Sequence, residues 1–80
     1  MKIKFTTIEE LYNFLNLIAK VNGNVDVASE DGRHVLDGKS FMGVMSLDLL
    51  KPINVICKED VETEDARNFY EALTKMGIAC

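Results

Sequence analysis

Apolar and polar residues recur along the chain with two different periods, which divide it into strands and helices. Residues 2–5 (KIKF) and 25–29 (VDVAS) alternate between polar and apolar, as half-buried strands do. Residues 7–21 and 62–76 instead repeat apolar positions at spacings of three and four, which predicts two amphipathic helices. The apolar stripe of the first helix comprises Ile8, Leu11, Leu15 and Ile18, widened by Tyr12, Phe14 and Ala19, and that of the second comprises Ala66, Phe69, Tyr70, Leu73 and Met76. Both stripes are expected to face a common core.

Capping residues mark the ends of these two helices. Thr7, with Glu10 three positions later, has the form of a capping box, in which side chains and backbone at the start of a helix exchange hydrogen bonds. Gly23 and Gly77 follow the two helices, and glycine suits the left-handed conformation that often ends a helix. The acidic stretch EDVETED, at 59–65, suits the positive end of the second helix dipole.

The middle of the chain is expected to form a hairpin, a short helix and a further strand. Residues 30–32 (EDG) have the composition of a tight turn, so 33–37 (RHVLD) is predicted to run back antiparallel to the strand before it. Ser40 is a favoured N-cap residue for a short helix over 41–47. The only proline then ends helical structure before 53–58 (INVICK), a run that favours a strand.

These elements follow the order β-α-β-β-α-β-α without a linker or an internal repeat, so a single domain covering residues 1–80 is expected. The simplest packing that buries all the apolar stripes is an α+β fold. It has a small antiparallel sheet covered on one face by the two longer helices.

Composition and charge exclude several classes of function. The 13 acidic and 9 basic residues give a net charge of −4, and the basic residues are scattered, so no nucleic-acid partner is expected. No apolar run reaches the roughly 18 residues that a membrane span needs. The first residues lack the apolar stretch of a secretory signal, so a cytoplasmic protein with no membrane contact is expected. Cys57 lies in an apolar run and Cys80 is the last residue, a pattern that predicts neither a metal site nor a disulfide framework.

Adjacent acidic residues are the feature that invites an enzymatic interpretation. They occur at Glu9 and Glu10, at Glu59 and Asp60, and at Glu64 and Asp65. Neighbouring carboxylates on a helix or turn usually form a solvated acidic face rather than an acid–base pair. No metal cluster, nucleophile triad or glycine-rich phosphate loop accompanies them, so neither an enzyme nor a cofactor is expected.

The string KSFMGVMSLD, at 39–48, resembles the short second helix of HPr, the phosphocarrier protein of the bacterial sugar phosphotransferase system. The similarity extends over nearly the whole chain, through the hairpin VDVASEDGRHV, the final strand and the helix VETEDARNFYEAL, in the same order. The resemblance implies an HPr-like open-faced β-sandwich, βαββαβα, with a four-stranded antiparallel sheet and three helices on one face. It also implies that the first and last strands lie in the middle region of the sheet.

The resemblance breaks down where HPr proteins carry their phosphorylated histidine. The family has a loop resembling G-I-H-A-R-P at the start of its first helix, whereas this chain reads FTTIEEL and has no histidine there. Thr7 stands near the histidine position, and Glu9 and Glu10 follow where the family has an arginine and a proline. Two carboxylates repel a phosphoryl group, so phosphocarrier chemistry and a catalytic residue are both expected to be absent. His34, the only imidazole, is predicted to lie in the second hairpin strand, where a side chain with no special role is favoured.

Ser40 matches the position at which many Gram-positive members of the family are phosphorylated by HPr kinase/phosphorylase. A phosphate at a helix N-cap meets free backbone amides, and Lys39 adds a neighbouring cation, although Ser40 is equally explained as a simple cap. The resemblance also implies that Phe41, Met42 and Met45, together with Lys39, form the docking surface for protein partners. Val44 and Leu47 would then face inward.

Two functions follow from the resemblance. The first is a histidine-less HPr-like regulatory or adaptor protein that acts through Ser40 phosphorylation and the docking helix at 41–45. Its expected partners are an HPr kinase/phosphorylase or a transcriptional regulator. The alternative is a protein-interaction or oligomerisation domain that keeps only the HPr fold and whose Ser40 is never phosphorylated.

Overall fold

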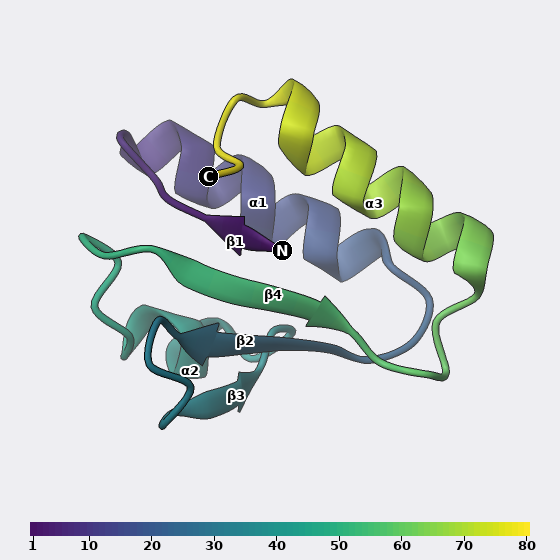
Figure 1. Ribbon diagram of the computed structural model, residues 1–80, viewed down its shortest axis with the longest axis horizontal. Coiled ribbons are helices and arrows are strands. Elements are labelled where there is room, and N and C mark those ends of the chain that lie inside the picture. The colour runs from purple at the N-terminus through teal and green to yellow at the C-terminus, as the bar shows by residue number, and fades with distance from the viewer.

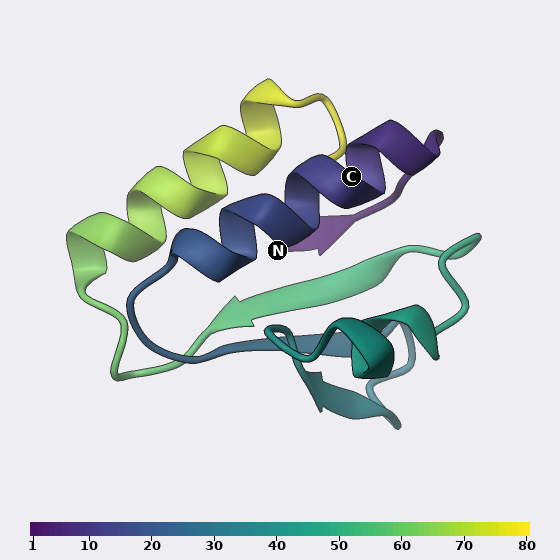
Figure 2. The ribbon, with the colours of Figure 1, turned by 180° about the vertical axis from the view of Figure 1, so that it is seen from behind.

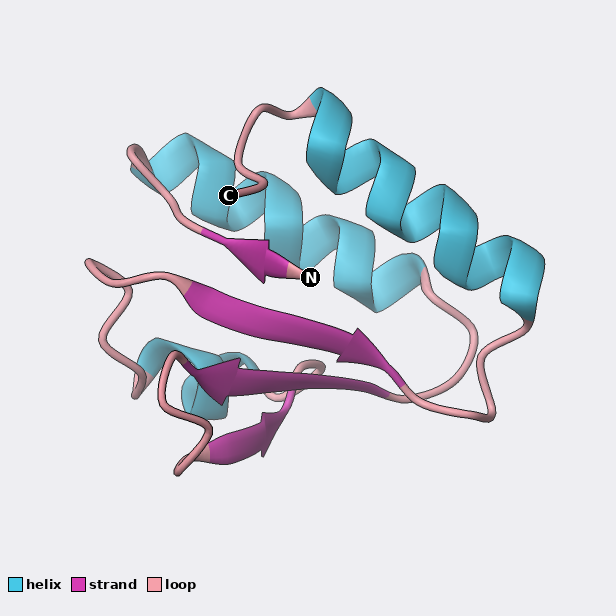
Figure 3. Ribbon diagram, viewed as in Figure 1, coloured by secondary structure: helices cyan, strands magenta, loops and turns pink.

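The computed structural model describes all 80 residues and has the α+β fold expected from the sequence (Figure 1). Its elements are β1 (Lys2–Ile3), α1 (Ile8–Lys20), β2 (Val25–Ser29), β3 (Val35–Asp37), α2 (Phe41–Met45), β4 (Ile53–Cys57) and α3 (Thr63–Lys75). The four strands form one open antiparallel sheet in the order β1-β4-β2-β3 (Figure 3). The predicted βαββαβα open-faced sandwich is therefore confirmed.

The position of β1 in the sheet corrects one expectation. The last strand, β4, does lie in the middle, between β1 and β2, but β1 lies at the edge of the named strands. The end of the chain covers its outer side: the Lys4 amide donates to the Ile78 carbonyl and the Cys80 amide donates to the Lys2 carbonyl, both at 2.9 Å. Backbone pairing with this terminal segment saturates the edge, so β1 needs no further strand beside it.

The core lies between one face of the sheet and the helices (Figure 2). Alternation along β4 shows this division, because Ile53 and Val55 are buried beneath the helices whereas Ile56 is 47% exposed on the opposite face. The long helices meet through aromatic rings: the ring centroid of Phe14 in α1 lies 6.5 Å from that of Phe69 in α3. The sheet face that carries Ile56 has no helix over it.

Several element boundaries differ from the predicted ones. The first strand ends at Ile3, and β3 begins only at Val35, so His34 precedes the strand instead of lying in it. The short helix ends at Met45, earlier than predicted. Ile8, placed by its spacing in the buried stripe of α1, is 68% exposed, because it lies in the first turn, beyond the edge of the core.

The predicted helix caps are present with one exception. The Thr7 hydroxyl accepts from the Glu10 amide at 3.1 Å, and the Glu10 carboxylate accepts from the Thr7 amide at 3.2 Å, which confirms the capping box. Gly77 follows α3 with a φ of 78°, as expected for a left-handed helix end. Gly23 also has a positive φ, of 122°, but α1 already ends at Lys20, and the C-cap residue Val21 has an extended backbone.

None of the helices has the length and apolar character needed to cross a bilayer. Both cysteines are free thiols; Cys57 is partly buried in β4 and Cys80 is exposed.

Candidate functional site

Ser40 is the N-cap residue of α2, as its residue type predicted. Its backbone is extended, and its hydroxyl oxygen accepts a hydrogen bond from the Gly43 amide at 3.2 Å. At the other end of this short helix the Ser46 hydroxyl donates to the Gly43 carbonyl at 2.6 Å. Serine side chains thus satisfy backbone groups at both ends, which allows a helix of a single turn and a half to persist on the surface.

Packing within the short helix favours glycine at position 43. A Cβ atom at this position would lie 3.1 Å from the Ser40 hydroxyl oxygen and 3.4 Å from the Ser40 Cβ. A side chain would therefore crowd the hydroxyl that caps the helix.

The two faces of α2 differ in exposure as expected. Phe41 is 50% exposed, Met42 80% and Met45 43%, whereas Val44 is fully buried and Leu47 is 9% exposed. We call Phe41, Met42 and Met45 the α2 patch. Val44 and Leu47 belong to the hydrophobic core, whereas the α2 patch faces solvent.

Lys39 bonds to the end of α1 and to the turn before α2. Its ammonium donates to the Val21 carbonyl at 2.6 Å, at the carboxyl end of α1, and its amide donates to the Asp37 carboxylate at 2.9 Å. A cation at this position stabilises the negative end of the α1 dipole. The ammonium therefore joins α1 to the start of α2.

Thr7 and Glu10 occupy the amino end of α1, where the HPr family holds its phosphate. The Glu10 Oε1 atom accepts hydrogen bonds from the Thr6 amide at 2.7 Å, from the Thr6 hydroxyl at 2.9 Å and from the Thr7 amide at 3.2 Å. These donors, led by the Thr6 amide, lower the pKa of Glu10. The Glu10 carboxylate thus already occupies the Thr6 and Thr7 amides just before the helix. Glu9, the residue before it, is exposed.

The lowered pKa of Glu10 predicts a pH-dependent contribution to stability. Because the pKa is lower in the folded state than the ordinary value of 4.5, the carboxylate stabilises the fold at any pH above that value and loses this effect as the pH falls through the folded pKa. Glu10→Ala is therefore expected to lower the free energy of unfolding at neutral pH and to have a smaller effect near about pH 3. Urea unfolding of both proteins at the two pH values measures the difference. A deficit that persists unchanged in acid would show that the charge plays no part.

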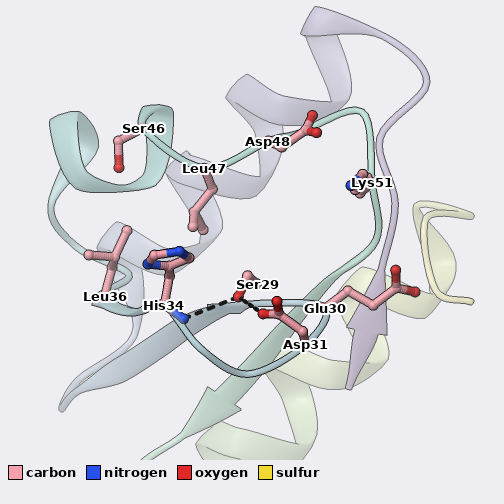
Figure 4. A pocket seen from close by; sticks show the side chains of 9 residues that line it. All are labelled: Ser29, Glu30, Asp31, His34, Leu36, Ser46, Leu47, Asp48 and Lys51. Carbon is pink, nitrogen blue, oxygen red and sulfur yellow. Dashed lines mark hydrogen bonds between the residues drawn. The ribbon is translucent and has the colours of Figure 1, made fainter.

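His34 lies beside a polar cavity, away from the start of any helix (Figure 4). The cavity is lined by Ser29, Glu30, Asp31, His34, Leu36, Ser46, Leu47, Asp48 and Lys51. The imidazole lies near Leu47, beyond the carboxyl end of α2, instead of facing the free amides at a helix start. This placement gives no support to His34 as a phosphate acceptor of the HPr kind.

The serine, aspartate and histidine of this cavity do not form a catalytic triad. The Ser29 hydroxyl donates to the Asp31 carboxylate at 2.6 Å and accepts from the backbone amide of His34 at 3.2 Å. This hydroxyl bond is the main cause of the lowered pKa of Asp31. A nucleophilic serine instead donates its proton to the imidazole ring. The contacts therefore stabilise the β2–β3 turn.

Sequence reasoning missed a second group of exposed apolar residues. Leu50, in the segment that joins α2 to β4, is 85% exposed, and Ile8 is 68% exposed. Both line a groove at the amino end of α1. The sequence does contain a signal for this group. The apolar run LLKPI at 49–53 is longer than the start of one buried strand requires.

Comparison with known proteins identifies no relative. No protein-family model matches the chain, and no curated protein or solved structure matches it significantly.

Proposed function

We propose that this protein is a histidine-less, HPr-like regulatory adaptor of the cytoplasm, which presents the α2 patch to a protein partner and is modified on Ser40. The observation that carries the proposal is the exposure of Phe41, Met42 and Met45 on a helix whose other face is buried. The order of the elements along the chain and the residues of 39–48 support the resemblance to HPr.

The chemistry of the α2 patch fits recognition of a protein. Methionine side chains are flexible and polarisable, so they adapt to a partner surface, and an aromatic ring supplies a large apolar contact. Phe41, Met42 and Met45 lie within a single short helix, so a partner can bury all three at once. The two hydroxyls of Ser40 and Ser46 hold this helix in place before binding, which reduces the entropy lost on association.

Phosphorylation of Ser40 would change this surface electrostatically. The hydroxyl oxygen lies next to the first turn of α2 and Ser40 is exposed, so a kinase can reach it. The added charge of about −1.5 to −2 would stand beside the α2 patch and alter which partner binds. A partner that docks on Phe41 and Met42 would sense the modification directly.

The placement of Lys39 favours the alternative function, an interaction domain whose Ser40 is never phosphorylated. Because the Lys39 ammonium already donates to the Val21 carbonyl at 2.6 Å, pairing with a phosphate at Ser40 would compete with this bond. In this case Ser40 serves only as the cap of α2, and the α2 patch alone carries the function.

Incubation with a bacterial HPr kinase and ATP separates the two functions. We expect phosphate on Ser40, detected by mass spectrometry, and none in Ser40→Ala. If the kinase docks on the α2 patch, Met42→Ser should slow the modification by about tenfold, the effect of losing one buried apolar contact. Ile56→Ser is the matched control, because Ile56 is also an exposed apolar side chain but lies on the bare face of the sheet.

Each result supports one function. Phosphate on Ser40 with a slower reaction in Met42→Ser supports the regulatory adaptor. An unmodified protein, with α2 intact by circular dichroism, supports the alternative.

A further inference from the structure

The loop between α1 and β2 contains the only asparagine–glycine pair of the chain, Asn22–Gly23. Every other asparagine precedes a valine, a leucine or a phenylalanine. The side-chain amide of an asparagine is open to attack by the backbone nitrogen of the next residue, and glycine hinders this attack least because it has no Cβ atom. Asn22 is exposed, so water reaches its side chain as well.

Packing requires glycine at position 23. Its φ is 122°, a conformation that residues with a side chain rarely adopt. A Cβ atom here would lie 2.8 Å from the Cγ2 atom of Val61 and 3.1 Å from the Asp60 carbonyl oxygen. The close packing of this loop against the segment between β4 and α3 therefore places Asn22 next to an unhindered backbone nitrogen.

The backbone amide of Gly23 is also free to react, because it takes part in no hydrogen bond. Two further pairs, Asp31–Gly32 and Asp37–Gly38, are able to close the same kind of ring from an aspartate. Their glycine amides donate to backbone carbonyls at 2.9 and 2.7 Å. Each of these amides must break a hydrogen bond before its nitrogen attacks, which protects both aspartates.

We propose that Asn22 is a site of spontaneous deamidation in the folded protein. The Gly23 nitrogen forms a bond to the Cγ atom of Asn22 and loses its proton. The bond between Cγ and the side-chain nitrogen breaks, and ammonia leaves, so a cyclic succinimide remains. Water then opens the ring at Cγ, which gives aspartate, or at the backbone carbonyl carbon, which gives isoaspartate. The sum is asparagine plus water giving the acid plus ammonia, without an oxidant or a cofactor.

Isoaspartate at position 22 would disturb the contact between two loops that lie side by side (Figure 1). The Asn24 backbone and side-chain amides donate to the Asp60 carboxylate at 3.1 and 2.8 Å. In isoaspartate the backbone runs through the side chain and is longer by one methylene group. This extra length comes just before Asn24, where Gly23 is already packed against Asp60 and Val61. We therefore expect the hydrogen bonds between Asn24 and Asp60 to break.

Aspartate at position 22 would preserve the backbone and add a negative charge at the carboxyl end of α1. An anion is unfavourable at this end of a helix. The Lys39 ammonium offsets the effect, because it donates to the carbonyl of the adjoining residue, Val21, at 2.6 Å. The isoaspartyl form is therefore expected to be the less stable of the two products.

Peptide mapping by mass spectrometry, after incubation of the folded protein in mildly alkaline buffer, tests the proposal. We expect position 22 to be deamidated at least about tenfold faster than any other asparagine. An isoaspartate-specific methyltransferase should label the same peptide. Asn22→Gln is the matched control, because glutamine must close a larger ring, and it should stay unmodified over the same time. Asn24, which is also exposed but precedes a valine, is the internal control.

Comparison with the protein unfolded in urea tests the part played by the fold. We expect similar rates at Asn22 in the folded and unfolded states, whereas isoaspartate at Asp31 and Asp37 should form only after unfolding. Deamidation of Asn22 that requires urea, or equal rates at Asn22 and Asn24 in the folded protein, would overturn the inference. The isoaspartyl form should also unfold at a lower urea concentration than Asn22→Asp, and equal midpoints would contradict the expected break at Asp60.

Discussion

Replacing Phe14 by alanine is expected to lower the free energy of unfolding by about 3–5 kcal/mol. Phe14 is fully buried, and its ring centroid lies 5.3 Å from that of Phe5 and 6.5 Å from that of Phe69. The ring therefore joins the segment after β1, helix α1 and helix α3. Its removal leaves a cavity that three separate elements would have to move to fill, so little of it can collapse.

The size of the domain makes this loss severe. A chain of 80 residues has a small core and a free energy of unfolding near the lower end of the usual range of about 5–15 kcal/mol. Urea unfolding followed by circular dichroism measures the change, provided that the slope with urea stays constant. Tyr12→Ala is the control, because Tyr12 lies in the same helix but is 53% exposed. Equal losses in the two variants would show that Phe14 does not hold the three elements together.

The order and type of the elements could be predicted from the sequence because burial imposes a period. The spacing of Phe69 and Leu73 in α3, and the alternation of Ile53 and Val55 in β4, follow directly from having one face toward the core. The capping box at Thr7 was equally predictable, because it depends only on residues three apart in one chain segment.

Features that depend on contacts between distant segments could not be read from local spacing. The spacing of Ile8 places it in the apolar stripe of α1, yet Ile8 is exposed because the first turn of the helix extends beyond the core. The binding of Lys39 to the Val21 carbonyl depends on how α1 and α2 are placed relative to each other. The edge position of β1 depends on its pairing with β4, which lies far along the chain. For the candidate site, the exposed face of α2 was predictable from its spacing, whereas the groove at Leu50 was not.

The protein is expected to accept no phosphate from phosphoenolpyruvate and Enzyme I of the phosphotransferase system. A phosphoimidazole needs a histidine nitrogen as nucleophile and free amides or cations around the phosphate. Here the amino end of α1 carries Thr7, and the Glu10 carboxylate accepts from the Thr6 and Thr7 amides just before the helix. His34 lies elsewhere, beside the polar cavity. The nucleophile and the phosphate-binding groups that the reaction requires are therefore not found together in this chain.

A variant with a histidine at position 7 tests whether the missing imidazole is the only obstacle to phosphate transfer. Thr7→His restores an imidazole at the helix end but leaves the Glu10 carboxylate on the Thr6 and Thr7 amides, so we expect this variant to stay unlabelled as well. Electrophoresis after incubation with radiolabelled phosphoenolpyruvate, Enzyme I and an active HPr as positive control measures the transfer, and circular dichroism verifies that the variant is folded. Label on the unmodified protein, at His34 or any other residue, would contradict the absence of carrier chemistry. Label on Thr7→His alone would show that the missing imidazole is the only obstacle and that the carboxylate at the helix end does not exclude phosphate.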